Sequence, residues 1–130
     1  ALLKEYTTIC NSAPSEFLAG VGLRNRKTIL NRNLQIIQNN LNRFDIFFNK
    51  HADLFSWWKP NAGPITLVKM HFDHDDLAFA DQALKKQSVM ILPGGVYNYP
   101  GYFRIGLGRK TIQEGLEQFE TFVLENLVAK

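Results

Sequence analysis

The longest regular pattern of hydrophobic positions in the chain lies between residues 28 and 50. Apolar side chains recur there at alternating spacings of four and three residues, the repeat of one face of an α-helix. The members of this stripe are Leu30, Leu34, Ile37, Leu41, Phe44 and Phe48, widened by Ile29 and Ile36. The pattern predicts a helix from about residue 28 to about residue 50, long enough to pack across a domain or to link two domains.

The segment before this helix has the composition of a helix start. Residues 12–16 (Ser-Ala-Pro-Ser-Glu) offer capping hydroxyls, a proline that the first turn tolerates and an early acidic residue. We therefore expect an extended lead-in over residues 1–13 and a long helical segment over residues 14–50. Gly20 and Gly22 weaken the first part of this segment and indicate a bend or a close helix contact.

The remainder of the chain alternates between strand and helix patterns. Residues 65–72 alternate apolar and polar side chains and predict a strand, and Asp75 or Asp76 is expected to cap a helix that ends near Lys86. Short strands are predicted over residues 88–92 and 102–107, with loops over 51–64 and 96–101. The last helix is expected to begin at Thr111, which can form a capping box with Glu114.

These elements predict an α+β fold. We expect a two-layer small domain with a long N-terminal helix and a three-stranded, mostly antiparallel sheet that carries helices on one face. The α+β core is expected over residues 63–130. A chain of 130 residues is one domain by the usual relation of length to domain count, so we predict a single domain over residues 1–130.

Composition narrows the class of protein. The chain is 45% hydrophobic and holds ten phenylalanines, which is enough for a packed core. Its net charge of +3 is small and its cations are scattered, so neither nucleic acid nor a membrane is an expected partner. One cysteine, Cys10, excludes an internal disulfide, and no leader-like segment opens the sequence. We expect a cytoplasmic protein.

Arg104 is the candidate site residue. It stands inside the apolar strand predicted at 102–107, and glycines follow it at Gly106 and Gly108. A guanidinium keeps its charge and binds a carboxylate through two parallel hydrogen bonds, so Arg104 needs an anionic partner. That partner is either a local carboxylate, such as Glu114 or Asp73, or a ligand. Arg109 is expected to be a surface cation.

Other groups of residues are weaker candidates. The acid and histidine cluster around residues 71–76 fits a solvated turn with a helix cap better than a metal site. Residues 106–111 fit a tight turn better than a phosphate loop, because the full glycine spacing is missing. Trp57 and Trp58 could line a ligand pocket, but burial at a domain interface is the preferred interpretation.

Five segments carry a family resemblance. They are residues 6–16, residues 29–33 with Asn40 and Leu41, residues 58–64 (Trp-Lys-Pro-Asn-Ala-Gly-Pro), residues 89–94 (Val-Met-Ile-Leu-Pro-Gly) and residues 103–106 (Phe-Arg-Ile-Gly). In this order and spacing they cover nearly the whole chain. The chain resembles the C-terminal small domain of the class I/II, fold type I, aminotransferases that depend on pyridoxal phosphate (PLP).

The resemblance implies a substrate-binding role. It places Arg104 as the arginine that binds the α-carboxylate of an amino acid or 2-oxo acid. The family's catalytic lysine forms a Schiff base with PLP, and none of the nine lysines here has its sequence context. We therefore predict no catalytic residue, cofactor-binding residue or metal ligand on this chain, PLP only in the full-length family, and no transamination by this chain alone.

The resemblance also implies a partner, an N-terminal large domain that the 130 residues do not include. The alternative is a free-standing, non-catalytic binding or self-association module of the same fold. The sequence leaves open the amino-acid specificity, the oligomeric state and the choice between a transaminase and a lyase or synthase.

Overall fold

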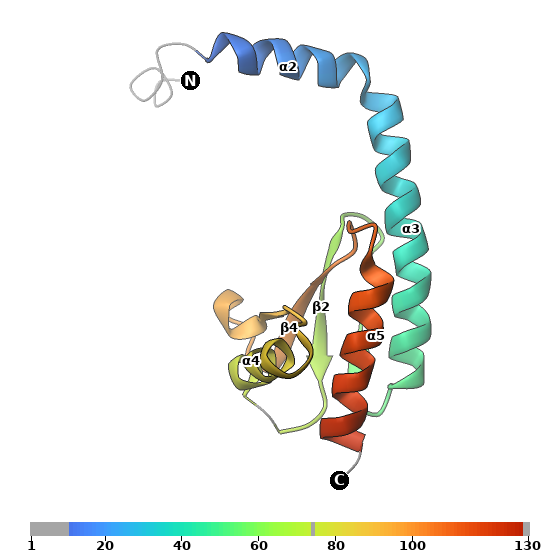
Figure 1. Ribbon diagram of the computed structural model, residues 1–130, viewed down its shortest axis with the longest axis vertical. Coiled ribbons are helices and arrows are strands. Elements are labelled where there is room, and N and C mark those ends of the chain that lie inside the picture. The colour runs from blue at the N-terminus through green and yellow to red at the C-terminus, as the bar shows by residue number, and fades with distance from the viewer. Residues whose placement is uncertain (1–10, 74, 129–130) are drawn as a thin grey trace. The chain divides into compact units, whose positions relative to one another are not determined.

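The computed structural model describes residues 11–73 and 75–128 (Figure 1). The chain divides into two compact units, one up to residue 34 and one from residue 35 onward. The predicted lead-in over residues 1–13, including Cys10, lies almost wholly outside the described residues, as does His74. The single-domain organisation stays a prediction.

Two helices form the N-terminal part. Helix α2, Ala13–Arg24, begins directly after Ser12 with proline in its first turn, as predicted. Asn25 caps the C-terminal end of α2, and α3, Arg26–Lys50, begins at the next residue. The long helix predicted near residues 28–50 is therefore confirmed. The second half of its apolar stripe reaches the core through Phe44 and Phe48, whereas Leu30 and Leu34 are exposed.

The sheet has four strands, so the prediction of three is wrong. Its order is β1-β2-β4-β3, with antiparallel pairing throughout. Strand β2, Ile65–Met70, and strand β4, Tyr102–Gly106, confirm two of the predicted strands. The additional strand β1, Phe55–Trp57, lies in the predicted loop over 51–64. Three residues are too few to show an alternating pattern beside the turn residues that surround them.

The third predicted strand is shorter and later than expected. Strand β3 is only Leu92–Pro93, paired with Arg104 and Phe103 of β4. Proline has no N–H to donate, and β3 is an edge strand, where this omission is tolerated. The upstream residue Ser88 adopts the left-handed conformation that ends the preceding helix. A 3₁₀ turn, η1, Gly94–Tyr97, replaces the first part of the predicted loop.

Two further helices complete the fold. Helix α4, Asp76–Gln87, is capped by Asp75, whose carboxylate accepts hydrogen bonds from the N–H groups of Leu77 and Ala78. Helix α5, Ile112–Val123, begins after Thr111, and a π-helical turn, η2, Leu124–Val128, continues it. The predicted capping box does not form, because the Thr111 side chain makes no capping hydrogen bond.

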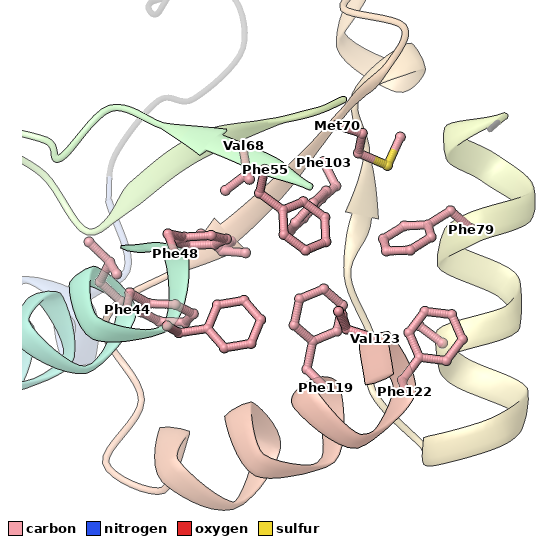
Figure 2. Close-up of a cluster of buried hydrophobic side chains, with 14 residues drawn as sticks. Phe44, Phe48, Phe55, Val68, Met70, Phe79, Phe103, Phe119, Phe122 and Val123 are labelled. Atoms are coloured by element: carbon pink, nitrogen blue, oxygen red, sulfur yellow. The ribbon is translucent and has the colours of Figure 1, made fainter. Parts of the chain in front are cut away.

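The core lies between the sheet and the helices, and Figure 2 shows its phenylalanine rings converging from both. Helices α3, α4 and α5 contribute Phe44, Phe48, Phe79, Phe119 and Phe122, and the strands contribute Phe55, Val68, Met70 and Phe103. Burying a phenylalanine side chain contributes about 1.5–3 kcal/mol, so this cluster dominates the stability of the unit. The side chains on the opposite face of the sheet do not belong to this core.

Candidate carboxylate-binding site around Arg104

Arg104 lies in the middle of β4, on the sheet face that turns away from the core. Along this strand Phe103 and Ile105 are buried and Arg104 is half-buried, as expected when side chains alternate between the two faces. Its neighbours in register are Leu67 on β2 and Leu92 on β3. The guanidinium is therefore presented from an apolar strand between two apolar residues.

The guanidinium contacts an aromatic ring rather than a carboxylate. Its central carbon lies 5.2 Å from the centre of the Tyr97 ring, within the range of a cation–π interaction. Among residues 11–73 and 75–128, the ion pairs involve other cations. The two local carboxylates that the sequence offered, Glu114 and Asp73, are not partners of Arg104. The anion that Arg104 needs is therefore not supplied by the described part of the chain.

A hollow of about 500 Å³ opens on the Tyr97 side of Arg104. We call it the aromatic hollow. Its lining residues are Trp58, Ile65, Thr66, Leu67, Tyr97, Tyr99 and Arg104. Arg104 is the only charged residue among them. The guanidinium and the Tyr97 ring that it contacts both belong to residues that line this hollow.

A second hollow of about 520 Å³ lies between β4, the segment of residues 88–91 and the first turns of α5. Arg104 lines it too, together with Arg109 and Glu114. Its charged lining residues therefore include a carboxylate as well as two arginines, whereas the described lining of the aromatic hollow includes no carboxylate. The contact with Tyr97 assigns the guanidinium to the aromatic hollow, and we take that hollow as the site.

Tyr97 is held in place by the start of α4. Gly95, in the same 3₁₀ turn as Tyr97, donates its backbone N–H to Oδ2 of Asp76 over 2.5 Å. Asp76 is buried, at the first residue of α4, where the helix dipole favours a negative charge. The acidic cluster around residue 75 is thus explained by a helix cap and a turn anchor. No group of three or more potential metal ligands forms among the residues that the structure describes.

Gly94 sets the shape of the same turn. A Cβ atom at this position would lie 2.7 Å from the carbonyl oxygen of Tyr102, and closer still to that of Tyr99. Only glycine leaves room for the backbone to pass so near β4. The Pro93-Gly94 pair therefore allows the turn to pack close to β4, where Tyr97 contacts Arg104.

The tryptophans separate into two roles. Trp57 packs in the core against Phe44 and Phe48, with ring centres 6.3 and 5.1 Å away. Trp58 is 66% exposed and lines the aromatic hollow. Sequence reasoning did not distinguish the two and missed Tyr97 and Tyr99 as neighbours of Arg104. Distinguishing the two tryptophans would have required the register of β1 with β2, because this register turns Trp57 toward the core and Trp58 away from it.

The residues around Arg104 do not fit PLP as a covalently held group. A Schiff base requires a lysine amine, and none of the lysines within residues 11–73 and 75–128 lines either hollow. Lys50, Lys59 and Lys85 are engaged in ion pairs with carboxylates. Which residues would hold the cofactor is therefore not identified among the described lining residues of the two hollows. No helix in the described ranges is both long and apolar enough to cross a membrane.

The chain matches no protein-family model and no curated protein. It does match solved structures. A PLP-dependent aminotransferase from Streptococcus suis is 28% identical with a TM-score of 0.85, over 94% of this chain and 33% of the enzyme chain. The PLP-dependent cyclase OrfR is 20% identical with a TM-score of 0.86, over 95% and 35% of the two chains.

A third structure, the PLP-bound C-S lyase from Staphylococcus hominis, is 20% identical with a TM-score of 0.65, over 82% of this chain and 30% of the lyase. The chain thus spans about a third of the length of the proteins that it matches. The resemblance found in the sequence is confirmed: this chain has the fold of the C-terminal small domain of PLP-dependent aminotransferases, a part that accounts for about a third of such proteins.

Proposed function

We propose that this chain is the carboxylate-binding part of a PLP-dependent aminotransferase, with Arg104 as the residue that binds the α-carboxylate of an amino acid or 2-oxo acid. The observation that carries the proposal is the position of Arg104. It stands in an apolar strand, over Tyr97 and without an ion-pair partner among the described residues. The match to PLP-dependent proteins supports the substrate class.

The chemistry of the site follows from the guanidinium. Two parallel N–H donors match the two oxygens of a carboxylate, so binding fixes both the position and the plane of the ligand. The half-buried setting strengthens this interaction relative to bulk water. Tyr97 restrains the guanidinium from one side, which reduces the conformational entropy lost on binding.

Transamination is assigned to the larger protein and not to this chain. PLP supplies the electron sink of the reaction when bound, but the lysine that would hold it is not found around Arg104. We propose that an N-terminal large domain provides it, consistent with the coverage of about a third of each related chain. A cytoplasmic location is part of the same proposal and rests on the single cysteine.

The proposal is tested by the binding of pyruvate, the simplest 2-oxo acid, to the 130-residue chain, measured by ligand-observed NMR. Arg104→Gln should weaken binding at least about tenfold, because two charge-assisted hydrogen bonds are lost. Arg109→Gln is the matched control, an exposed arginine near the end of the same segment, and should bind as the parent does. Equal binding by the parent and Arg104→Gln contradicts the proposal.

The assignment of PLP chemistry elsewhere has its own test. The chain is incubated with PLP and reduced with borohydride, and the products are mapped by mass spectrometry. We expect only scattered, substoichiometric labelling of exposed lysines. A stoichiometric reduced imine at a single lysine would overturn the assignment.

A non-catalytic self-association module is the second candidate. Helix α2 has no buried residue, and Phe17, Leu18 and Leu23 are each at least 65% exposed. Large apolar side chains gathered on one helix favour association with another surface. Sedimentation velocity over a hundredfold range of concentration tests this candidate. A concentration-dependent dimer that is lost in Leu18→Glu supports it, and a monomer at every concentration contradicts it.

A further inference from the structure

The aromatic hollow concentrates exposed apolar side chains beside one cation. Trp58, Ile65 and Tyr99 are each at least half exposed, although all three are large and mostly apolar. They line the same hollow as Leu67 and Arg104. Exposed apolar surface of this kind, with a few polar groups beside it, is the usual composition of a small-molecule site.

The charge pattern limits what can occupy the hollow. Arg104 provides one positive charge, and no other lining residue in the described part of the chain is charged. One carboxylate of a ligand can therefore be paired. A second carboxylate placed farther into the hollow would lose its hydration without gaining a cation, which is unfavourable. A ring or a branched aliphatic group would instead cover the exposed faces of Trp58 and Tyr99.

The volume agrees with this chemistry. About 500 Å³ lies within the range of sites that hold ligands of drug size. A three-carbon acid such as pyruvate would contact Arg104 and leave most of the aromatic lining uncovered. A ligand that carries an aromatic ring beyond its carboxylate would contact both Arg104 and the aromatic lining.

From this arrangement we infer that the Arg104 site selects monocarboxylic 2-oxo acids or amino acids with an aromatic or large apolar side chain, and that Trp58 and Tyr99 contact that side chain. The inference rests on the proposed function and names its substrate class. Part of the specificity then resides on this chain.

The experiment compares three 2-oxo acids on the 130-residue chain by ligand-observed NMR at constant ionic strength: phenylpyruvate, pyruvate and 2-oxoglutarate. Phenylpyruvate should bind about tenfold more tightly than pyruvate, which corresponds to one favourable ring contact. The second carboxylate of 2-oxoglutarate should bring no gain over pyruvate. Quenching of tryptophan fluorescence by phenylpyruvate should disappear in Trp58→Phe, which keeps Trp57.

Variants separate the ring contact from the carboxylate contact. Trp58→Ala should bring the Kd of phenylpyruvate to within about threefold of that of pyruvate. Tyr99→Ala provides a second variant with the same expected direction. Leu77→Ala is the control, because Leu77 is also exposed but does not line the hollow.

The outcomes distinguish an error in the inferred side-chain class from an error in the proposed carboxylate site. Equal Kd values for phenylpyruvate and pyruvate, or tighter binding of 2-oxoglutarate, overturn the inferred side-chain class and leave Arg104 as a carboxylate site. Binding of all three acids that persists in Arg104→Gln overturns the proposed function and the inference with it. A preference for phenylpyruvate that requires both Arg104 and Trp58 supports both.

Discussion

The side-chain amide nitrogen of Asn40 donates a hydrogen bond to the carbonyl oxygen of Leu107 over 2.8 Å, and so joins α3 to the residue that follows β4. The same nitrogen donates to the carbonyl oxygen of Arg109 over 2.7 Å. Asn40 is only 1% exposed. The segment that leaves the Arg104 strand is thus fixed by one buried side chain that is distant in sequence.

Removing this amide should destabilise the chain. Asn40→Ala leaves two backbone carbonyls without their donor and opens a small cavity, so we expect a loss of about 2–3 kcal/mol in the free energy of unfolding. Urea unfolding followed by circular dichroism measures the change. Asn39→Ala is the matched control, since Asn39 is exposed in the same helix. Equal stability of the two variants would refute a structural role for Asn40.

Gly94 should tolerate no side chain. In Gly94→Ala the new Cβ would overlap the backbone of Tyr102, and we expect a loss of about 2–3 kcal/mol from overpacking. Gly115→Ala, inside α5 with no atom near its Cβ position, should instead gain about 0.5–1 kcal/mol from helix propensity. Thermal unfolding of the two variants should therefore shift in opposite directions. A shift of the same sign and size in both would contradict the packing argument.

The sequence predicted the elements with strong periodicity and missed those defined by tertiary contacts. The helix that became α3 and the strand that became β4 each carry a pattern that repeats in their own residues. Strand β1 has three residues, and its strand character comes from pairing with β2. Strand β3 is confined to Leu92–Pro93 because Ser88 turns the chain out of α4 first. A local sequence pattern shows neither the pairing of β1 with β2 nor the turn at Ser88.

The candidate site likewise contains one residue that the sequence predicted and several neighbours that it did not. Arg104 could be selected from the sequence, because a permanent positive charge among the apolar residues of a predicted strand is visible in the sequence alone. Its neighbours could not, since Trp58, Leu67 and Tyr97 come from three separate segments. The sequence offered Glu114 and Asp73 as carboxylates that could pair with Arg104. The antiparallel register placed aromatic and aliphatic residues there instead.

Asp76 should couple the stability of α4 to the position of Tyr97. Asp76→Ala removes the acceptor of the Gly95 N–H and a favourable charge at the helix N-terminus, with an expected loss of about 2 kcal/mol. Asp76→Asn keeps an acceptor oxygen and should lose less. The control is Asp81→Ala, whose surface ion pair with Lys85 should contribute less than about 1 kcal/mol. Chemical denaturation ranks the three, and an equal loss in Asp76→Ala and Asp81→Ala would exclude the anchor role.

Glu120 should make part of the stability dependent on pH. The hydrogen bond from Lys50, with Nζ and Oε1 2.6 Å apart, lowers the pKa of Glu120 below its usual value near 4.5, and His51, whose Nε2 lies 3.2 Å away, lowers it further. Burial opposes both effects without cancelling them. Because the folded-state pKa lies below the unfolded one, the carboxylate stabilises the fold fully above about pH 4.5, and this contribution is lost as the pH falls through the folded-state pKa.

Glu120→Gln tests this dependence. The variant should be less stable than the parent at pH 7, by about 1 kcal/mol for a partly exposed ion pair. The difference should shrink as the pH is lowered from 5 toward 3, because the parent then loses the same charge by protonation. Urea midpoints measured across this range provide the comparison, with Glu117→Gln as the control on the same helix, where Glu117 has no cationic partner among the described residues. A gap between parent and Glu120→Gln that stays constant down to pH 3 would show that the carboxylate charge contributes nothing, and that the interaction of α5 with Lys50 and His51 depends on packing alone.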